Sequence, residues 1–500
     1  MSTTPRETAI PQPNARADLR ALFLALATLA LYAASCLLEN ALYRNGLNGP
    51  APFLGPAAAP DRLLLAQQLI GYVAIISLLF WIYVRILSMC ERGELAGRGT
   101  RLIVLVAPVI ANLLLLWWLP RLSQDIFSYV AQGLLGHIYG DNPLLQAPSV
   151  VQSSPFASQL AAFNWRPVTI VSPYGILWTR LEMASVHLAR GNVLLAVVLL
   201  KSVAVLASLG SAALIWWIVG RIAPAMQFRA TLAYLWNPLI IMDLAGSGHN
   251  DALMLFFSLL ALAAVLRSDG AASGVAQFFG VITKYVCVLF LPAQLACLWW
   301  QKRSAARFAL MVCVALAICA FIAALLYAPL WHGIRSFDGL LKRAAPVSSA
   351  SFFGIVDWIL RRSPLHAAAG QITLIVAGLP LLAVLAWSVV SVRTAEDLAR
   401  ACAWISLVFT LVTCPDYWPQ YACLPVAWII VGEMRRLFWL ALLLSACARL
   451  IAPLDIIREH GLATMHVSKG LMTGVGSLVP LVALLIWLGT RVRTAPTEHA

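Results

Sequence analysis

Charged residues are scarce in this sequence of 500 residues. Only 11% are Asp, Glu, Lys or Arg, whereas soluble domains carry about 25%. Hydrophobic residues make up 61% of the chain, and the mean hydropathy is +0.84. This composition excludes a soluble enzyme, a disordered chain and a small disulfide scaffold. It predicts an all-α polytopic membrane protein.

Several motifs of soluble chemistry are also missing. The sequence has no GxxxxGK[ST] phosphate loop, no GxGxxG after a strand and no HExxH. The ten cysteines form no CxxC pair and no metal-ligand spacing. Cys414 and Cys423 flank one short loop, where either free thiols or a disulfide would fit, with free thiols favoured. We therefore predict no bound metal and no cofactor, although a divalent metal is compatible with the sequence, and any transferred group must arrive on an activated donor.

Positive charge exceeds negative charge, with 35 Lys and Arg against 21 Asp and Glu. In a soluble protein this excess would suggest nucleic acid. Here the basic residues form short clusters between apolar runs, such as Arg98 with Arg101 and Lys302 with Arg303, which is typical of cytoplasmic loops. We predict no nucleic-acid partner, and both termini on the cytoplasmic side.

Twelve apolar runs are candidates for spanning helices, which need about 20 residues each. They are 20–39, 63–87, 102–119, 191–218, 229–246, 251–266, 308–327, 371–392, 400–413, 421–433, 437–453 and 471–489. The stretch 275–300 does not fit this alternation, because basic residues on both sides of it favour the cytoplasm. A re-entrant hairpin resolves the conflict, since arms of about 10 to 13 residues reach about 15 to 20 Å and place Lys284 within the membrane.

Two long segments, 120–190 and 328–370, then lie on the outer side of what we treat as one transmembrane domain over 1–500. Loops longer than about 15 residues between packed elements are usually functional. The first has apolar residues at helical spacing, including Ile126 and Val130, which predicts amphipathic helices at the membrane interface. On this topology every histidine except His499 lies outside, so we expect the chemistry to be external.

Polar residues at or near membrane depth are the site candidates, because a charge there costs several kcal/mol unless it is paired or hydrated. Asp125 follows the third predicted span by a few residues. It could face an external cavity, or Ser123 or Asp125 could simply cap the following helix. Lys284 could bind an anionic ligand, or could pair with Asp243 or another carboxylate.

A second group follows Pro238, which interrupts a predicted span. A glycine-rich turn leads into a helix whose first residues are His249, Asn250 and Asp251, and free N–H groups at a helix start attract anions. The alternative is that Asn250 or Asp251 only caps that helix. The late segment Thr413–Tyr421 combines a carboxylate with aromatic rings, which suits a sugar but is also common at membrane interfaces.

Together these residues resemble the bacterial GT-C class of membrane glycosyltransferases, and most of all the polyprenol-phosphate-mannose-dependent α-mannosyltransferases. The similarity lies in the segments 123–133, 140–143, 172–178, 236–238 and 249–254, in Lys284 and in 414–418. The late loop departs from the family's Pro-Trp-Tyr motif, because Asp416 is inserted and the two aromatic residues are reversed.

The resemblance implies a GT-C fold and an inverting transfer of a hexose, mannose by this similarity, from a polyprenyl monophosphate to a glycan, lipid or glycolipid hydroxyl. It implies that Asp125 is the general base and that Lys284, His249 and Asn250 bind the donor phosphate. Residues implied to bind sugar or acceptor are Tyr129, Gln132, Tyr174, Asp251, Asp416, Tyr417 and Trp418.

Two other classes of function stay open. An O-antigen ligase or polymerase would also join lipid-linked glycans, using basic residues such as Arg335 and Arg361 in the second long loop. A transporter or flippase of lipid-linked sugars would show internal repeats and paired charges at mid-membrane, and we find no such repeat. We expect the protein in the bacterial inner membrane, among membrane lipids, with its active site facing the periplasm or exterior.

Overall fold

The computed structural model describes residues 15–42, 62–163, 165, 171–343, 351–459 and 465–494, and within them the protein is all-helical. The chain termini, on which the predicted cytoplasmic ends depend, lie outside these residues, as do His460 and His499. The helices are α1 (Ala15–Leu42), α2 (Arg62–Glu91), α3 (Arg98–Leu116), α4 (Asp125–His137), α5 (Phe156–Ala161), α6 (Ile176–Leu188), α7 (Val193–Ile222), α8 (Gln227–Leu235), α9 (Asp251–Leu266), α10 (Gly270–Val281), α11 (Leu291–Lys302), α12 (Ala305–Tyr327), α13 (Asp338–Arg343), α14 (Phe352–Leu360), α15 (Ala369–Ser391), α16 (Ala395–Val408), α17 (Cys423–Gly432), α18 (Met434–Glu459), α19 (Met465–Thr473) and α20 (Val479–Thr494).

Eight helices in the described part of the chain are long and apolar enough to cross a membrane, or nine if one bent pair counts as a span. The prediction of twelve is therefore not matched by helix length. Four predicted runs form shorter elements: 229–246, 251–266, 400–413 and 421–433. Proline is one cause, because Pro238 interrupts the first of these runs and Pro419 opens the turn before α17.

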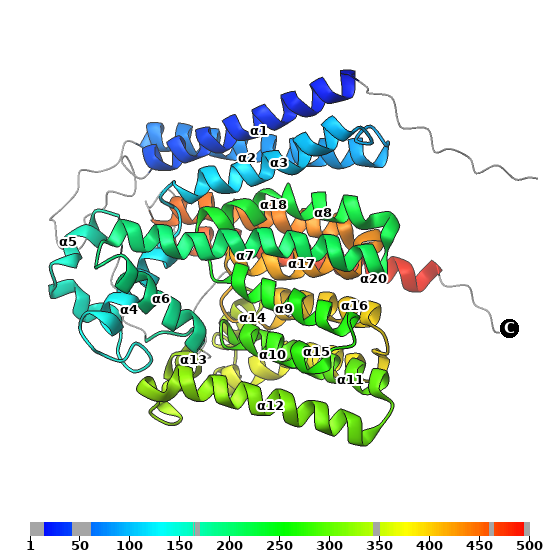
Figure 1. Ribbon diagram of the computed structural model, residues 1–500. Helices are drawn as coiled ribbons and strands as arrows, with labels where there is room; N and C mark the ends of the chain where they lie inside the picture. Colours follow the sequence, from blue (N-terminus) through cyan, green and yellow to red (C-terminus); the bar gives the residue numbers. More distant parts are fainter. Residues whose placement is uncertain are drawn as a thin grey trace, which may run out of the picture.

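The long helices lie side by side, and α4, α5 and α6 gather at one end of them (Figure 1). The first long loop thus contains helices, as predicted, and the apolar side chains of α4 are buried within the protein. Ile126, Val130 and Leu134 have no exposed area, because α6 and α7 cover the helix. At Gly133 a Cβ atom would lie 2.4 Å from the Glu182 carbonyl oxygen, so α4 and α6 can pack this closely only through glycine.

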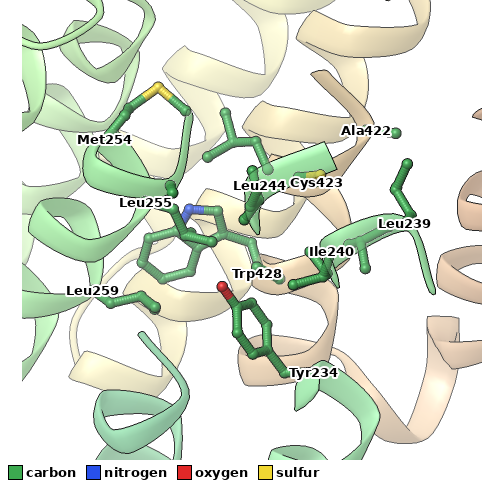
Figure 2. Packing of buried hydrophobic residues seen from close by; sticks show 14 of the residues in the cluster. Tyr234, Leu239, Ile240, Leu244, Met254, Leu255, Leu259, Ala422, Cys423 and Trp428 are labelled. Carbon is green, nitrogen blue, oxygen red and sulfur yellow. The ribbon is translucent and has the colours of Figure 1, made fainter. Parts of the chain in front are cut away.

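A core of interlocking side chains joins the middle helices. Trp428 of α17 is 1% exposed and lies among Leu255 and Leu259 of α9 and Tyr234 of α8 (Figure 2). Helices in lipid are held together mainly by close packing and hydrogen bonds, because the lipid is as apolar as the side chains. The short helices α8, α9 and α17 are therefore buried inside the bundle rather than facing lipid.

The chain bends sharply before α9. The π-helical turn Ile240–Gly246 and α9 meet at 110°. Gly248 occupies a left-handed conformation with φ of 71°, which glycine adopts without strain. After the bend, α9 begins at Asp251, with Asn250 at its N-cap position and His249 just before it.

The segment α10 to α11 forms a hairpin whose tip is Lys284. The two arms contact each other, since Gln294 Nε2 donates to Ser273 Oγ at 2.6 Å and Lys302 Nζ donates to the Ser268 carbonyl at 3.1 Å. The chain therefore reverses over the predicted segment 275–300, beginning slightly earlier, and its re-entry into the membrane stays a prediction. Its tip is anchored by α6, because the Gly175 N–H donates to the Thr283 carbonyl at 3.1 Å.

Lys201, inside α7, fixes the end of α3. Its ammonium group has no exposed area and donates to the carbonyls of Leu115, at 2.6 Å, and Trp118. Both carbonyls lie where α3 ends, and a lysine near a helix C-terminus can donate to the last carbonyls. Lys201 thus holds the beginning of the segment from Trp118 to Asp125 in place.

Candidate active site

A cavity of about 270 Å³ opens where α1, α4, the turn Ile240–Gly246 and α18 approach one another. The charged and histidine side chains that line it are Glu39, Arg121, Asp125, Asp243, His249, Lys284, Arg449 and Asp455. Tyr174, Trp418, Gln420 and Tyr421 also line it. Residues from the first long loop, the bend before α9, the hairpin tip and the late loop therefore meet at one place, as a single site requires.

Asp125 is the first residue of α4, and its side chain is 40% exposed. Its Oδ2 atom lies 3.4 Å from His249 Nε2, and Gln420 Nε2 donates to the same oxygen at 3.4 Å. Ser123 Oγ accepts a hydrogen bond from the Asp125 N–H at 3.4 Å. Ser123 thus meets the start of the helix, while the Asp125 carboxylate faces the cavity.

His249 is fixed from both sides of its ring. Nδ1 lies 2.8 Å from the Asp243 carbonyl oxygen, and Nε2 lies 3.2 Å from Ser123 Oγ and 3.4 Å from the Asp125 carboxylate. A carbonyl oxygen can only accept, so Nδ1 carries a hydrogen. A second hydrogen on Nε2 would then donate to the carboxylate, and the arrangement favours the imidazolium form beside an ionised Asp125.

Lys284 pairs with Asp251, not with Asp243. The ammonium nitrogen lies 2.9 and 2.8 Å from the two carboxylate oxygens of Asp251 and 4.3 Å from the centre of the Tyr421 ring. The lysine side chain is 15% exposed, and that of Asp251 is 4% exposed. The structural pairing that the sequence left open is therefore present, and Lys284 also lines the cavity.

Asp243 pairs with Arg449, which the sequence analysis missed. Arg449 Nη1 donates to Asp243 Oδ2 at 2.8 Å, and Nη2 donates to the Tyr72 hydroxyl. Tyr72 in turn donates to Glu39 at 3.4 Å. The sequence could have indicated Arg449 as a site residue, because it is a charged residue inside the predicted span 437–453. Gln420 was missed for a different reason, since an uncharged residue in a loop carries no comparable signal.

Several predicted sugar-binding residues are buried away from the cavity lining. Tyr129 is 1% exposed and packs edge-on against Tyr174, with ring centres 5.1 Å apart. Tyr417 is also 1% exposed, and Asp416 and Tyr417 are both absent from the lining, whereas Tyr174 and Trp418 are part of it. A direct role of the buried residues in binding stays a prediction. Their contacts show that they support neighbouring residues that line the cavity.

Gln132 faces Glu182 instead of the cavity. With its amide oriented to satisfy both groups, the nitrogen lies 3.2 Å from each Glu182 carboxylate oxygen and 3.1 Å from Ser172 Oγ. Glu182 has no exposed area, and burial raises the pKa of its carboxyl well above the usual range. A neutral acid and an amide thus join α4 to α6 behind the site.

Asn250 is fully buried, and neither of its side-chain polar atoms has a hydrogen-bond partner in the described part of the chain. It does not line the cavity. Among the described residues no group of three or more His, Cys, Asp or Glu is arranged to hold a metal ion. All ten cysteines, including Cys414 and Cys423, are free thiols.

Comparison with known proteins identifies the family. The family model described as "Alpha-(1->6)-mannopyranosyltransferase, N-terminal domain" matches residues 24–328, more than half of the chain. The chain belongs to the alpha-(1->6)-mannopyranosyltransferase family. The match includes Asp125, His249 and Lys284, while Gln420 and Arg449 lie beyond it.

Individual members of the alpha-(1->6)-mannopyranosyltransferase family align over shorter stretches. Alpha-(1->6)-mannopyranosyltransferase A of Mycobacterium tuberculosis is 26% identical over 234 residues, which is 43% of this chain and 42% of that protein. The protein of the same name from Corynebacterium glutamicum is 29% identical over 177 residues, 35% of this chain and 34% of its own length. The alignments thus span less than half of each of these relatives.

Proposed function

We propose that this chain is an inverting GT-C mannosyltransferase that moves mannose from a polyprenyl monophosphate to a hydroxyl of a cell-envelope glycan or lipid. The observation that carries the proposal is the partly exposed Asp125 carboxylate in a cavity that also holds Lys284 and His249. The relatives are named for mannosyl transfer with alpha-(1->6) linkage. Membership of their family supports the same reaction type here.

Asp125 acts as the general base in this scheme. The acceptor oxygen attacks the anomeric carbon, its proton passes to the Asp125 carboxylate, and the bond between the anomeric carbon and the phosphate oxygen breaks with its electron pair leaving on phosphate. His249 and Gln420 both contact Oδ2 of Asp125 and hold the carboxylate in place. A helix start provides a rigid base for the group, because Asp125 is the first residue of α4.

Cations near the leaving phosphate supply the second part of the catalysis. Negative charge grows on the phosphate as the bond breaks, and preorganised positive groups stabilise it. Lys284 is the first such group, because it reaches the cavity from the hairpin tip, and His249 is the second. A phosphate monoester is already a good leaving group, so the scheme requires no general acid.

Inversion fixes the stereochemistry of the donor. Attack opposite the leaving group inverts the anomeric carbon, so an alpha-linked product requires a beta-linked polyprenyl phosphate sugar. The donor panel described below therefore includes both anomers.

The cavity end of the molecule is proposed to face the periplasm or exterior. The helix ends far from the cavity carry the basic residues: α3 starts at Arg98, α9 is followed by Arg267, α11 ends at Lys302, and α18 begins beside Arg435. Under the positive-inside rule those ends are cytoplasmic. Twelve crossings result if the four shorter runs 229–246, 251–266, 400–413 and 421–433 each cross the bilayer beside the eight long helices. The hairpin then enters from the cytoplasmic side.

Replacing Lys284 by alanine is expected to weaken donor binding by about tenfold or more, because a charge-assisted hydrogen bond contributes about 1.5 to 3 kcal/mol. The single substitution also leaves Asp251 buried without its cation. The double variant Lys284→Ala/Asp251→Asn removes that charge and separates binding from folding. Donor affinity is measured by titration of a polyprenyl phosphate sugar in nanodiscs. Unchanged affinity in a folded double variant would remove Lys284 from the phosphate site, and Asp251→Asn alone is the control.

Sugar transfer by the purified chain tests the proposed function. The protein in nanodiscs is supplied with alpha- and beta-linked polyprenyl phosphate mannose, other polyprenyl phosphate sugars and a nucleotide-linked mannose, with cell-envelope extract as acceptor. We expect transfer from beta-linked polyprenyl phosphate mannose only. Transfer from another lipid-linked sugar would correct the sugar, while no transfer from any donor would favour a ligase or a transporter.

A further inference from the structure

Two exposed histidines meet on the surface outside the candidate active site. His137 lies in the last turn of α4, and His187 lies in the last turn of α6. Nδ1 of His187 is 3.2 Å from Nε2 of His137, and the two rings stand at 86° with their centres 4.8 Å apart. Neither side chain lines the cavity, so the mechanism proposed above does not use them.

We infer that His137 and His187 form a surface site for a divalent transition-metal ion such as Zn²⁺, Ni²⁺ or Cu²⁺. Imidazole nitrogen is a preferred ligand for these ions and a poor one for Mg²⁺ or Ca²⁺. Two such ligands from different helices converge here, and water would complete the coordination.

The spacing of the two nitrogens fits this chemistry. Zinc–nitrogen bonds are about 2.0 to 2.1 Å long, so two nitrogens 3.2 Å apart subtend about 100 to 105° at a shared ion. This angle is close to the tetrahedral value, and the ion would lie to one side of the line that joins the two nitrogens. The ring that now donates the hydrogen bond moves its proton to its other nitrogen, and both exposed rings tilt so that their facing lone pairs point to the ion.

Location gives the site a structural consequence. α4 begins at Asp125 and α6 begins directly after Tyr174 and Gly175, while the histidines lie at the opposite ends of the same two helices. A helix of 13 residues is about 20 Å long, so the metal would link α4 and α6 about 20 Å from the cavity. It would thereby restrain α4, which carries Asp125, and α6, which begins just after Tyr174, without touching either residue.

Metal titration of the full chain, in detergent and without an affinity tag, tests the inference. We expect one Ni²⁺ or Zn²⁺ per chain by calorimetry, and a rise in Tm with metal, because binding to the folded state alone stabilises it. His137→Ala and His187→Ala should each lower the affinity at least tenfold and abolish the rise. His366, an exposed histidine far along the sequence, provides the matched control His366→Ala, which should bind as the parent does.

Electron paramagnetic resonance of bound Cu²⁺ gives a second readout. Two coordinated imidazoles are expected in the parent chain, and fewer than two in either alanine variant. Both substitutions are at exposed positions, so we expect the Tm without metal to equal that of the parent chain. This measurement checks that the variants fold. Metal binding that survives both substitutions, or a Cu²⁺ spectrum that does not change, overturns the inference.

Discussion

Asp125→Asn is expected to lower the rate of sugar transfer about 10²- to 10⁴-fold, the usual contribution of a general base. The amide keeps the size of the carboxylate and still presents an oxygen to His249 and Gln420. It cannot accept the acceptor's proton at neutral pH. The effect should therefore fall on the chemical step, measured as single-turnover transfer in nanodiscs, while donor affinity changes little.

The matched control for this prediction is Asp141→Asn. Asp141 lies in the same long loop just beyond α4, partly exposed and outside the cavity lining. Its substitution should leave both the rate and the affinity as they are. If Asp125→Asn transfers sugar at the parent rate, Asp125 is not the base, and its contacts with His249 and Gln420 serve only to shape the cavity.

Sequence patterns anticipated the kind of fold better than the number of spans. Apolar runs revealed the long helices, since a single segment can satisfy its own backbone within lipid only as a helix. The runs 400–413 and 421–433 form helices shorter than the spanning length, and hydropathy did not reveal this, because a run buried among other helices is as apolar as one that faces lipid. α17 shows this, with only 10 residues and nearly all of them buried.

Charge at membrane depth anticipated part of the site. Asp125, His249 and Lys284 were each suspected separately, and the structure places all three on one cavity. Their partners were not predictable, because the pairing of Lys284 with Asp251 and of Asp243 with Arg449 depends on how the hairpin and α18 pack against the bend before α9. No spacing in the sequence encodes those distances.

The two ion pairs near the cavity differ in the burial of their cations. Lys284 is 15% exposed and lines the cavity, whereas its partner Asp251 is 4% exposed and does not line it. In the proposed function Lys284 exchanges this carboxylate contact for a ligand phosphate. Arg449 with Asp243 is more deeply buried, with side chains 5% and 4% exposed. The same Asp243 accepts the hydrogen bond from His249 Nδ1 through its backbone carbonyl. The buried pair therefore supports the histidine that contacts Asp125.

This difference in burial predicts a large effect on stability. Arg449→Met is expected to destabilise the fold by about 3 to 5 kcal/mol, because it leaves the Asp243 carboxylate buried without a cation. Arg361→Met is the control, since Arg361 pairs with Asp357 at 2.6 Å but is 54% exposed. Loss of an exposed pair costs about 1 kcal/mol or less. Thermal unfolding in one detergent compares the two variants directly.

Removing both members of the buried pair distinguishes charge from packing. In Arg449→Met/Asp243→Asn no unpaired charge remains, so most of the lost stability should return. The backbone carbonyl of residue 243 is unchanged by the substitution and still accepts from His249, so sugar transfer should recover together with the fold. Equal destabilisation in the single and double variants would mean that packing around Arg449, rather than the buried carboxylate, limits stability.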